Sequence, residues 1–291
     1  MNSLSDFEAI GLALAGFTFW VLADSVIKAV GKSSLPAHEV IGFLGLSVVL
    51  CLTAYAVVRG EARLLWPRQP RRQAIRSCLD LINNLCVVVA LRHVPLTLFY
   101  ILVFTAPMVI TILAAIFLKE RVEVRKALAI VAGFAGVVIA VNPFSTSRPG
   151  DWIGYAACMV CVACFSVNMV WARVLTRTET PESLTFSSGI VMVIAGFGLM
   201  LWHGEPLTSR LLAALFATGL FGALGSICFF IALKHTSAAN VSQYHYTQLL
   251  SGALIAYLVF HELPTPFMFL GGSLIIASGL YIAAVARAVA V

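Results

Sequence analysis

The tetrapeptide ALRH at residues 90–93 returns as ALKH at residues 232–235, 142 positions further along the chain. Further matches follow in the same order: Trp20 with Phe165, Lys28 with Arg173 and Pro36 with Pro181 at a shift of 145, and Lys119-Glu120 with His261-Glu262 at 142. The shift between matching residues thus changes by three along the chain, as insertions and deletions in loops would produce. An ordered series at half the chain length therefore predicts two copies of one structural unit.

The composition excludes a soluble protein. Of the 291 residues, 60% are hydrophobic and 11% are charged, against roughly 25% charged residues in a typical soluble chain. The mean hydropathy is +0.97. So few charged side chains cannot cover the surface of a soluble fold of this length, and we expect an integral membrane protein.

Apolar runs long enough to cross a bilayer recur along the whole chain. Their continuous apolarity indicates helices rather than the alternating strands of a barrel, and a helix satisfies its own backbone groups in lipid. We therefore predict an all-α membrane protein with ten transmembrane helices, near 8–30, 37–58, 73–91, 95–118, 125–142, 151–174, 184–202, 211–233, 237–260 and 266–287.

Ten spans place both ends of the chain on one side of the membrane. Fourteen of the 19 Lys and Arg residues fall on that side, six of them between residues 59 and 76. Because cytoplasmic loops are enriched in Lys and Arg, we expect both termini in the cytoplasm of a cell whose inner (plasma) membrane holds the protein. The net charge of +6 and the basic stretch 68–72 also allow nucleic-acid binding, but a topology-setting loop is favoured and no nucleic-acid partner is expected.

Each copy holds five spans, and an odd number forces the second copy into the membrane upside down. We expect a single membrane domain made of two inverted repeats, residues 8–142 and 151–287. Inverted repeats are an architecture of secondary transporters, because exchanging the conformations of the halves turns an inward-open cavity outward. The first residues, MNSLSDFE, carry acids where a signal peptide carries bases, so the first span is expected to be retained.

The repeated residues resemble the EamA domain, present twice, of the drug/metabolite transporter superfamily. The resemblance rests on Trp20, Lys28 and Pro36, on Pro95, Pro107, Leu118-Lys119-Glu120, Gly133 and Gly136, and on Leu233, Phe260-His261-Glu262, Gly272 and Gly279. It implies ten helices around a central cavity between helices 1–4 and 6–9, and export of amino acids, drugs or other metabolites, or movement of nucleotide sugars. The second copy departs from the pattern at two positions: Leu249 stands where the first copy has Pro107, and Phe165 stands where it has Trp20. A weaker likeness to the aromatic amino acid exporters rests on organisation and cavity chemistry.

Polar and aromatic side chains form stripes at helical spacing on several spans. In lipid such stripes face protein or a water-filled cavity, and amides with aromatic rings suit a small amphipathic ligand. No basic cluster lies mid-membrane, which argues against phosphate-bearing substrates. The candidate substrate-binding residues are Trp20, Asp24, Asn83, Asn84, Tyr100, Phe165, Asn168, Ser226, Phe229, Gln243, Tyr244 and Gln248.

Two of these stripes allow more than one interpretation. The polar arc of residues 240–252 indicates either a cavity wall, which we favour, or hydrogen bonds between helices. Gly219, Gly222 and Gly225 indicate either a close approach of two helices or a stretch of cavity wall without side chains.

Asp24 and Asp80 are the carboxylates inside the predicted spans. Each lies four residues from a basic side chain, Lys28 or Arg76, so each can form an ion pair within its helix. That interpretation is favoured for Asp80. Asp24 can instead bind a substrate ammonium group or carry a coupling proton.

No motif predicts an enzyme, a metal site or a cofactor. Cys158, Cys161 and Cys164 have a spacing found in iron–sulfur proteins, but they lie inside a span, where cysteine is a small apolar residue. His261-Glu262 matches the repeat, so a role at a helix end is favoured over metal binding. Walker A is absent, so ATP is not expected as the direct energy source.

The sequence therefore predicts a secondary transporter, a monomer or weak homodimer, that exports small metabolites by alternating access. Amino acids, including aromatic ones, are the first candidates for the substrate. The alternatives are efflux or uptake of a drug or vitamin-like compound, a passive facilitator and, less favoured, a membrane-embedded enzyme.

Overall fold

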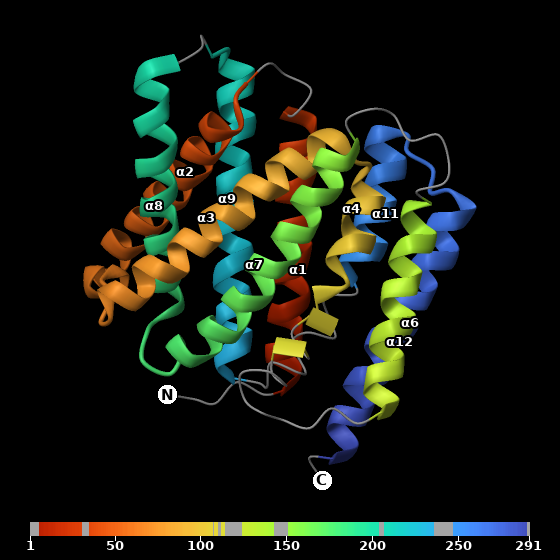
Figure 1. Ribbon diagram of the computed structural model, residues 1–291. Helices are drawn as coiled ribbons and strands as arrows, with labels where there is room; N and C mark the ends of the chain where they lie inside the picture. Colours follow the sequence, from red (N-terminus) through yellow and green to blue (C-terminus); the bar gives the residue numbers. More distant parts are fainter. Residues whose placement is uncertain are drawn as a thin grey trace.

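The computed structural model describes residues 6–30, 35–106, 108–109, 112–113, 124–142, 151–203, 207–235 and 247–289. These residues form helices and no strand (Figure 1). The first half contains α1 (Asp6–Val30), α2 (Ala37–Arg59), η1 (Ala62–Leu65), α3 (Pro70–His93), α4 (Leu96–Val103) and α6 (Val124–Val141). The second half contains α7 (Asp151–Leu175), α8 (Pro181–His203), α9 (Ser209–His235), α11 (Thr247–Phe260) and α12 (Pro266–Val289).

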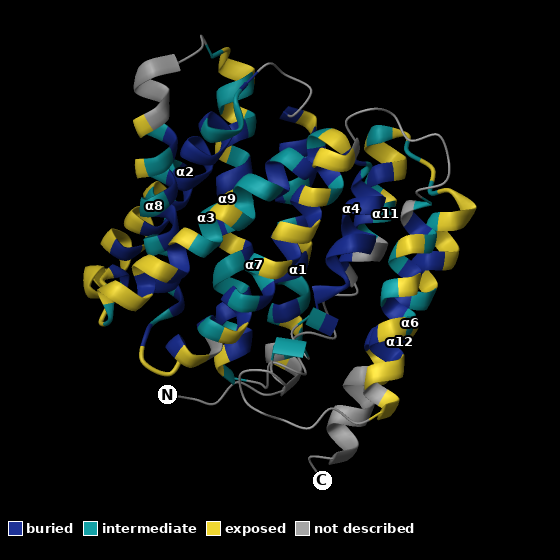
Figure 2. Cartoon of the chain, in the orientation of Figure 1, coloured by how far each residue is buried: buried dark blue, intermediate teal, exposed yellow. Residues whose placement is uncertain are grey.

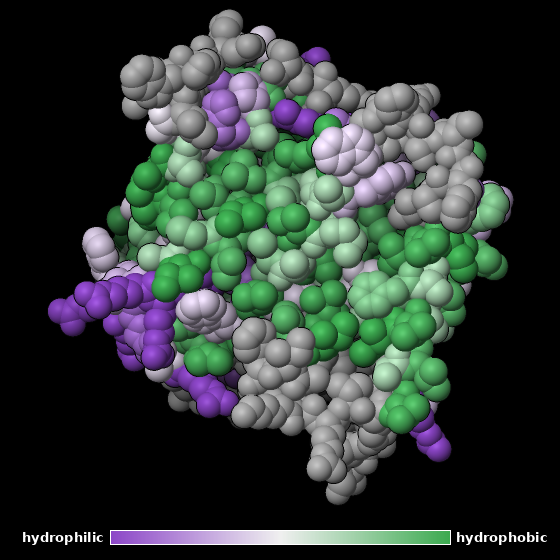
Figure 3. Space-filling view, viewed as in Figure 1, coloured by the Kyte–Doolittle hydropathy of each residue, from purple (hydrophilic) through white to green (hydrophobic). Residues whose placement is uncertain are grey.

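The outer surface of this bundle is apolar. Large hydrophobic side chains such as Val58, Val124 and Leu263 are exposed, and hydrophobic residues cover the middle of the face seen in Figure 3. In Figure 2, exposed residues lie on the outside of the helices and buried ones toward the interior. Exposed apolar surface of this extent is unfavourable in water and is satisfied by lipid. The chain is therefore a multi-pass membrane protein.

Within the described part of the chain, five helices reach the length and apolarity of a membrane span by themselves. They are α1, α2, α3, α7 and α9, and shorter apolar helices lie at Ala127–Ala140, Ser251–Phe260 and Pro266–Tyr281. The helix bounds lie within about four residues of the predicted spans, except in two places. The predicted span 237–260 is described from Thr247 onward, and the predicted span 95–118 is interrupted.

The interruption of that fourth span lies at the end of α4. The helix ends at Val103, and Phe104 and Thr105 form a turn before the chain is helical again. The sequence carries a proline at position 107. A proline ring crowds the carbonyl four residues earlier and has no N–H to donate to it, so a helix ends or kinks before it.

The helices pack in pairs that join the two halves of the chain. α1 packs against α9 and α3 against α7, while α2 packs against α8, α4 against α11 and α6 against α12. In chain order, the helices α1, α2, α3, α4 and α6 of the first half correspond to α7, α8, α9, α11 and α12 of the second. Under this correspondence the α1–α9 pair becomes the α7–α3 pair, and the pairs α2–α8, α4–α11 and α6–α12 each map onto themselves. α1 and α7 run in opposite directions (Figure 1). This packing has the symmetry that two inverted copies produce.

Glycines permit the close approach of α2 and α8. A Cβ atom built on Gly196 would lie 2.8 Å from the carbonyl oxygen of His38 and against the backbone of Gly42. Gly198, two residues further on the same helix, has no atom within 4 Å of the same position. Substituting Gly196 and Gly198 in turn therefore distinguishes the effect of helix packing from the low helix propensity of glycine.

We expect Gly196→Ala to lower the midpoint of thermal unfolding in detergent by about 3–10 °C, because overpacking costs about 1–3 kcal/mol. Gly198→Ala is the matched control and should leave the midpoint unchanged or raise it slightly. Equal midpoints for the two variants would contradict this account of the α2–α8 contact.

Candidate functional site: a polar cavity at the centre of the bundle

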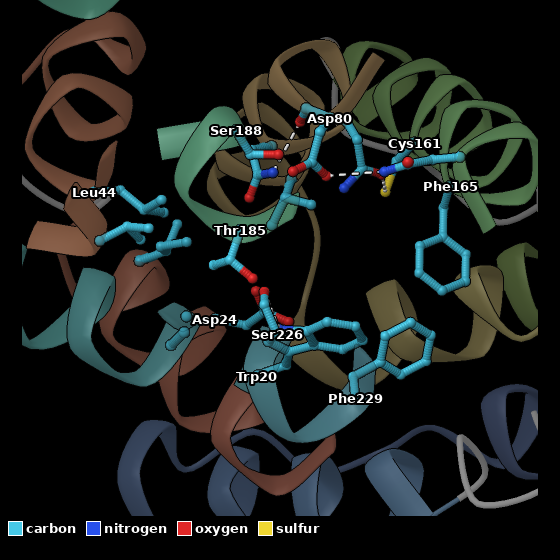
Figure 4. A pocket seen from close by; sticks show the side chains of 18 of the residues that line it. Trp20, Asp24, Leu44, Asp80, Cys161, Phe165, Thr185, Ser188, Ser226 and Phe229 are labelled. Atoms are coloured by element: carbon cyan, nitrogen blue, oxygen red, sulfur yellow. Dashed lines mark hydrogen bonds between the residues drawn. The ribbon is translucent and has the colours of Figure 1, made fainter. Parts of the chain in front are cut away.

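A cavity of about 160 Å³ lies between α1, α2, α3, α4, α7, α8, α9 and α11 (Figure 4). A single water molecule needs about 10–15 Å³ of such space. The cavity therefore has room for several waters or a small organic molecule. Its wall is built from both halves of the chain. A site between inverted halves is the position at which secondary transporters bind their substrates.

The structure brings ten of the twelve predicted binding residues onto this one wall. They are Trp20, Asp24, Asn83, Asn84, Tyr100, Phe165, Asn168, Ser226, Phe229 and Gln248. Gln243 and Tyr244, together with Asn240 of the same polar arc, lie outside the described residues. A shared cavity wall is a finding about position, and contact of these residues with a substrate remains a prediction.

Asp24 lies on the α1 side of the cavity and interacts with a neutral group. The Tyr100 hydroxyl donates a hydrogen bond of 2.8 Å to Asp24 Oδ2. The Tyr100 ring is buried against Gly252 of α11, where a Cβ atom would meet the ring. Asp24 has no ion-pair partner among the described residues, so the alternative of a pair with Lys28 within the helix is wrong.

Lys28 binds a different carboxylate because its side chain points to the end of the bundle. Its Nζ lies 2.9 Å from Glu262 Oε1 and donates to the carbonyl oxygen of Val94 at 3.1 Å. Glu262 Oε2 also accepts a hydrogen bond of 3.0 Å from the backbone N–H of Leu96, the first residue of α4. Glu262 thus caps a helix, as its predicted role at a helix end requires, and ties α1, α3, α4 and α11 together.

A buried arginine organises the opposite side of the cavity. Arg76 on α3 donates to Asn168 Oδ1 at 3.3 Å, and Asn168 Nδ2 donates to Asp80 Oδ1 at 3.1 Å. Arg76 also donates to the carbonyl oxygen of Leu184 at 2.6 Å and to Ser188 Oγ at 2.5 Å. The predicted direct ion pair of Arg76 with Asp80 is therefore replaced by a bridge through Asn168, which joins α3, α7 and α8.

Aromatic rings form the apolar part of the wall. The Trp20 and Phe229 ring centroids lie 4.9 Å apart, and Phe17 packs edge-on against both. The indole N–H of Trp20 donates to Ser226 Oγ at 3.4 Å. Figure 4 shows Phe165 across the opening from Ser188 and near Phe229. Rings and polar groups therefore face one space, as an amphipathic ligand requires.

Gln248 supports both interpretations of its polar arc. It lines the cavity, and its amide also donates a hydrogen bond of 3.1 Å to the backbone carbonyl oxygen of Phe17 on α1. The amide therefore serves the contact between α1 and α11, which is the packing alternative. Ser251, one turn further along the arc, donates to the backbone carbonyl oxygen of Gln248 at 3.4 Å.

Sequence analysis missed the contribution of α8 to the wall. Thr185 and Ser188 line the cavity together with Gly189 and Met192. The available signal was the polar run SLTFSSG at 183–189, in which Thr185 and Ser188 lie one helical turn apart.

The described residues contain no group of three or more His, Cys, Asp or Glu side chains that could hold a metal ion. Cys158 and Cys161 are buried in the α3–α7 contact. Cys161 Sγ lies 3.2 Å from Asn83 Oδ1 and donates to it. These thiols pack and form hydrogen bonds inside the bundle.

Known proteins are similar to this chain in sequence and in fold. The profile of the EamA-like transporter family matches residues 8–142 and 152–284. A solved crystal structure shares the fold, with a TM-score of 0.66 at 16% identity over 96% of this chain and 98% of that one.

Curated relatives are similar over most of their length. The pseudopaline exporter CntI of Pseudomonas aeruginosa is 27% identical over 268 residues, which cover 91% of this chain and 92% of that protein. A riboflavin transporter of Rhizobium johnstonii is 29% identical over 216 residues, 73% of this chain and 70% of that protein. An S-adenosylmethionine uptake transporter of Rickettsia bellii is 25% identical over 263 residues, 89% and 88% of the two chains.

Proposed function

Because the chain belongs to the EamA-like transporter family, we propose that it is a secondary transporter that exports small metabolites by alternating access. The observation that carries this proposal is the central cavity, which α1, α2, α3 and α4 enclose from one half of the chain and α7, α8, α9 and α11 from the other. Rearrangement of inverted halves around such a cavity exposes it to each side of the membrane in turn.

The membrane topology that this mechanism needs is ten spans in two inverted five-helix repeats, residues 8–142 and 151–287. The pairing of helices across the halves supports it. Arg59, Arg63, Arg68 and Arg71 are exposed at the end of the bundle that holds η1 and the start of α3, which lies at the lower left in Figure 1. Basic residues mark the cytoplasmic side. We therefore place this end, and both termini, in the cytoplasm beneath the inner membrane.

Amino acids, aromatic ones included, are the first candidates for the substrate. The cavity offers amide and carboxylate groups for an amino group, and it offers rings for an apolar body. The second candidate function is transport, including uptake, of a larger vitamin-like compound. The relatives named as riboflavin and S-adenosylmethionine transporters favour this second candidate. The relatives are named as transporters, and no catalytic activity is proposed.

A counterflow experiment in proteoliposomes tests this function. Vesicles loaded with one unlabelled compound are diluted into a trace of the same labelled compound, using the twenty amino acids, riboflavin and S-adenosylmethionine in turn. We expect transient accumulation of at least one label above its equilibrium level, which protein-free vesicles do not show. Saturable flux without counterflow would indicate a passive, channel-like facilitator, and absence of all flux would contradict transport of these compounds.

A further inference from the structure

The described residues that line the cavity include two carboxyl groups and no basic side chain. Asp24 and Asp80 line the cavity, whereas no Lys, Arg or His does so among the described lining residues. A low-dielectric cavity lined by one sign of charge raises the local concentration of ions of the opposite sign. The electrostatics of this wall therefore depend on how far nearby basic residues compensate the two carboxylates.

The two carboxylates differ in this compensation. Asp80 shares the amide of Asn168 with Arg76, so a positive charge lies just behind it. Asp24 accepts a hydrogen bond from the neutral Tyr100 hydroxyl, and the lysine on its own helix is bound to Glu262. Asp24 is therefore the carboxyl group of the cavity that has no basic partner among the described residues.

Aromatic rings lie beside this carboxylate. In Figure 4, Asp24 and Trp20 project into the cavity next to Ser226, with the Phe229 ring beside the indole. The face of an indole ring attracts a cation, and the attraction grows when water is removed. A carboxylate next to aromatic rings is an arrangement that suits an organic cation and repels an anion.

We propose that the transported substrate carries a cationic group, an ammonium, sulfonium or amidinium, attached to an apolar body. The charged group sits between the Asp24 carboxylate and the Trp20 ring, and the apolar body lies along Phe229 and Phe165. This proposal rests on the proposed transport function and narrows its substrates. Compounds with such a group and no net negative charge are accepted, and compounds with net negative charge are excluded.

Gly222 on α9 offers a place to measure this charge preference without knowing the substrate. It lines the cavity, and a Cβ atom built on it meets no atom within 4 Å. At Gly225, by contrast, a Cβ atom would lie 2.5 Å from Trp20 Cδ1, and Gly219 packs against Ser47 and Leu44. A side chain at position 222 therefore extends into the cavity, while its two neighbouring glycines serve helix contacts.

The experiment labels Gly222→Cys with two methanethiosulfonate reagents of similar size. One carries a trimethylammonium group and the other a sulfonate group, and each forms a mixed disulfide and releases methanesulfinate. Peptide mass spectrometry gives the labelling rate at position 222 separately from the native cysteines. Because the same thiolate attacks both reagents, the ratio of the two rates does not depend on how far the thiol is ionised.

We expect the ratio of cationic to anionic labelling to exceed the ratio for free N-acetylcysteine by about tenfold or more. Adding Asp24→Asn should lower this excess several-fold. Adding Glu61→Gln, which removes an exposed carboxylate outside the cavity, should leave it unchanged. Leu224→Cys, on the exposed side of α9, should react slowly with both charged reagents.

Three results would overturn the proposal: a ratio equal to that of N-acetylcysteine, a ratio insensitive to Asp24→Asn, or labelling at position 222 no faster than at 224. If Gly222→Cys fails to fold, Ser226→Cys on the same wall takes its place with the same expectations. The counterflow experiment is separate from this measurement. A cavity without charge preference that still supports counterflow would refute the substrate class alone, and cation preference without any counterflow would count against the transport function.

Discussion

Asp24→Asn is expected to reduce net flux under an imposed pH gradient at least about tenfold, for the substrate that the counterflow experiment identifies, while the protein stays folded. The substitution keeps the size of the side chain and removes the negative charge that faces the cavity. The loss has two possible physical causes, because the carboxylate either holds the cationic group of the substrate or exchanges the proton that drives transport. A loss of about 1.4 kcal/mol of interaction is enough for a tenfold effect.

Two measurements separate these causes from a structural defect. The thermal midpoint in detergent should stay near that of the wild type, since an amide can still accept the hydrogen bond of Tyr100. Tyr100→Phe leaves the charge in place and should impair transport less than Asp24→Asn does. If the carboxylate carries the coupling proton, Asp24→Asn removes the dependence of flux on an imposed pH gradient but retains exchange. Unchanged, pH-dependent transport by Asp24→Asn would refute both roles.

Arg76→Met is expected to have the largest effect on stability. Arg76 is 1% exposed, and the substitution removes its hydrogen bonds to Asn168, Leu184 and Ser188. Removing one partner of a buried charged network costs about 3–5 kcal/mol, because the remaining groups stay buried. For a chain of this size that corresponds to a fall of about 5–15 °C in the thermal midpoint.

A second substitution tests the cause of this loss. If the uncompensated Asp80 carboxylate contributes, Arg76→Met combined with Asp80→Asn should recover part of the lost stability, so the two effects will not add. Thermal unfolding in detergent of the four proteins of this cycle provides the measurement. A midpoint for Arg76→Met within about 2 °C of the wild type would show that the bridge through Asn168 does not hold α3, α7 and α8 together.

Much of the cavity wall could be predicted from the sequence, for a physical reason that applies to particular residues. Asn83, Asn168 and Gln248 carry amides that lipid cannot hydrogen-bond, so they had to face protein or water. The α8 residues Thr185 and Ser188 were missed because a hydroxyl can satisfy itself on its own helix backbone, so it is a weaker signal than an amide.

The partners of the charged residues could not be predicted in the same way. Spacing of four residues suggested pairs within α1 and α3. In the structure, however, Lys28 binds Glu262, 234 positions away in the sequence, and Asn168 lies between Arg76 and Asp80. Local spacing shows which side chains can meet on one helix. It does not show which neighbouring helix brings a better partner.

By itself, the sequence determined that this chain is helical, lies in a membrane and is built from two copies of one unit. These properties follow from hydrophobicity summed over long segments and from matches between the halves, and neither depends on side-chain contacts. Tertiary structure alone decided that Asp24 faces the cavity without an ion-pair partner among the described residues. It also decided that Gly222 lines the cavity while Gly219 and Gly225 serve helix contacts. The physical reason is that burial and pairing depend on distances between helices far apart in the sequence, and residue spacing within a single helix carries no information about those distances.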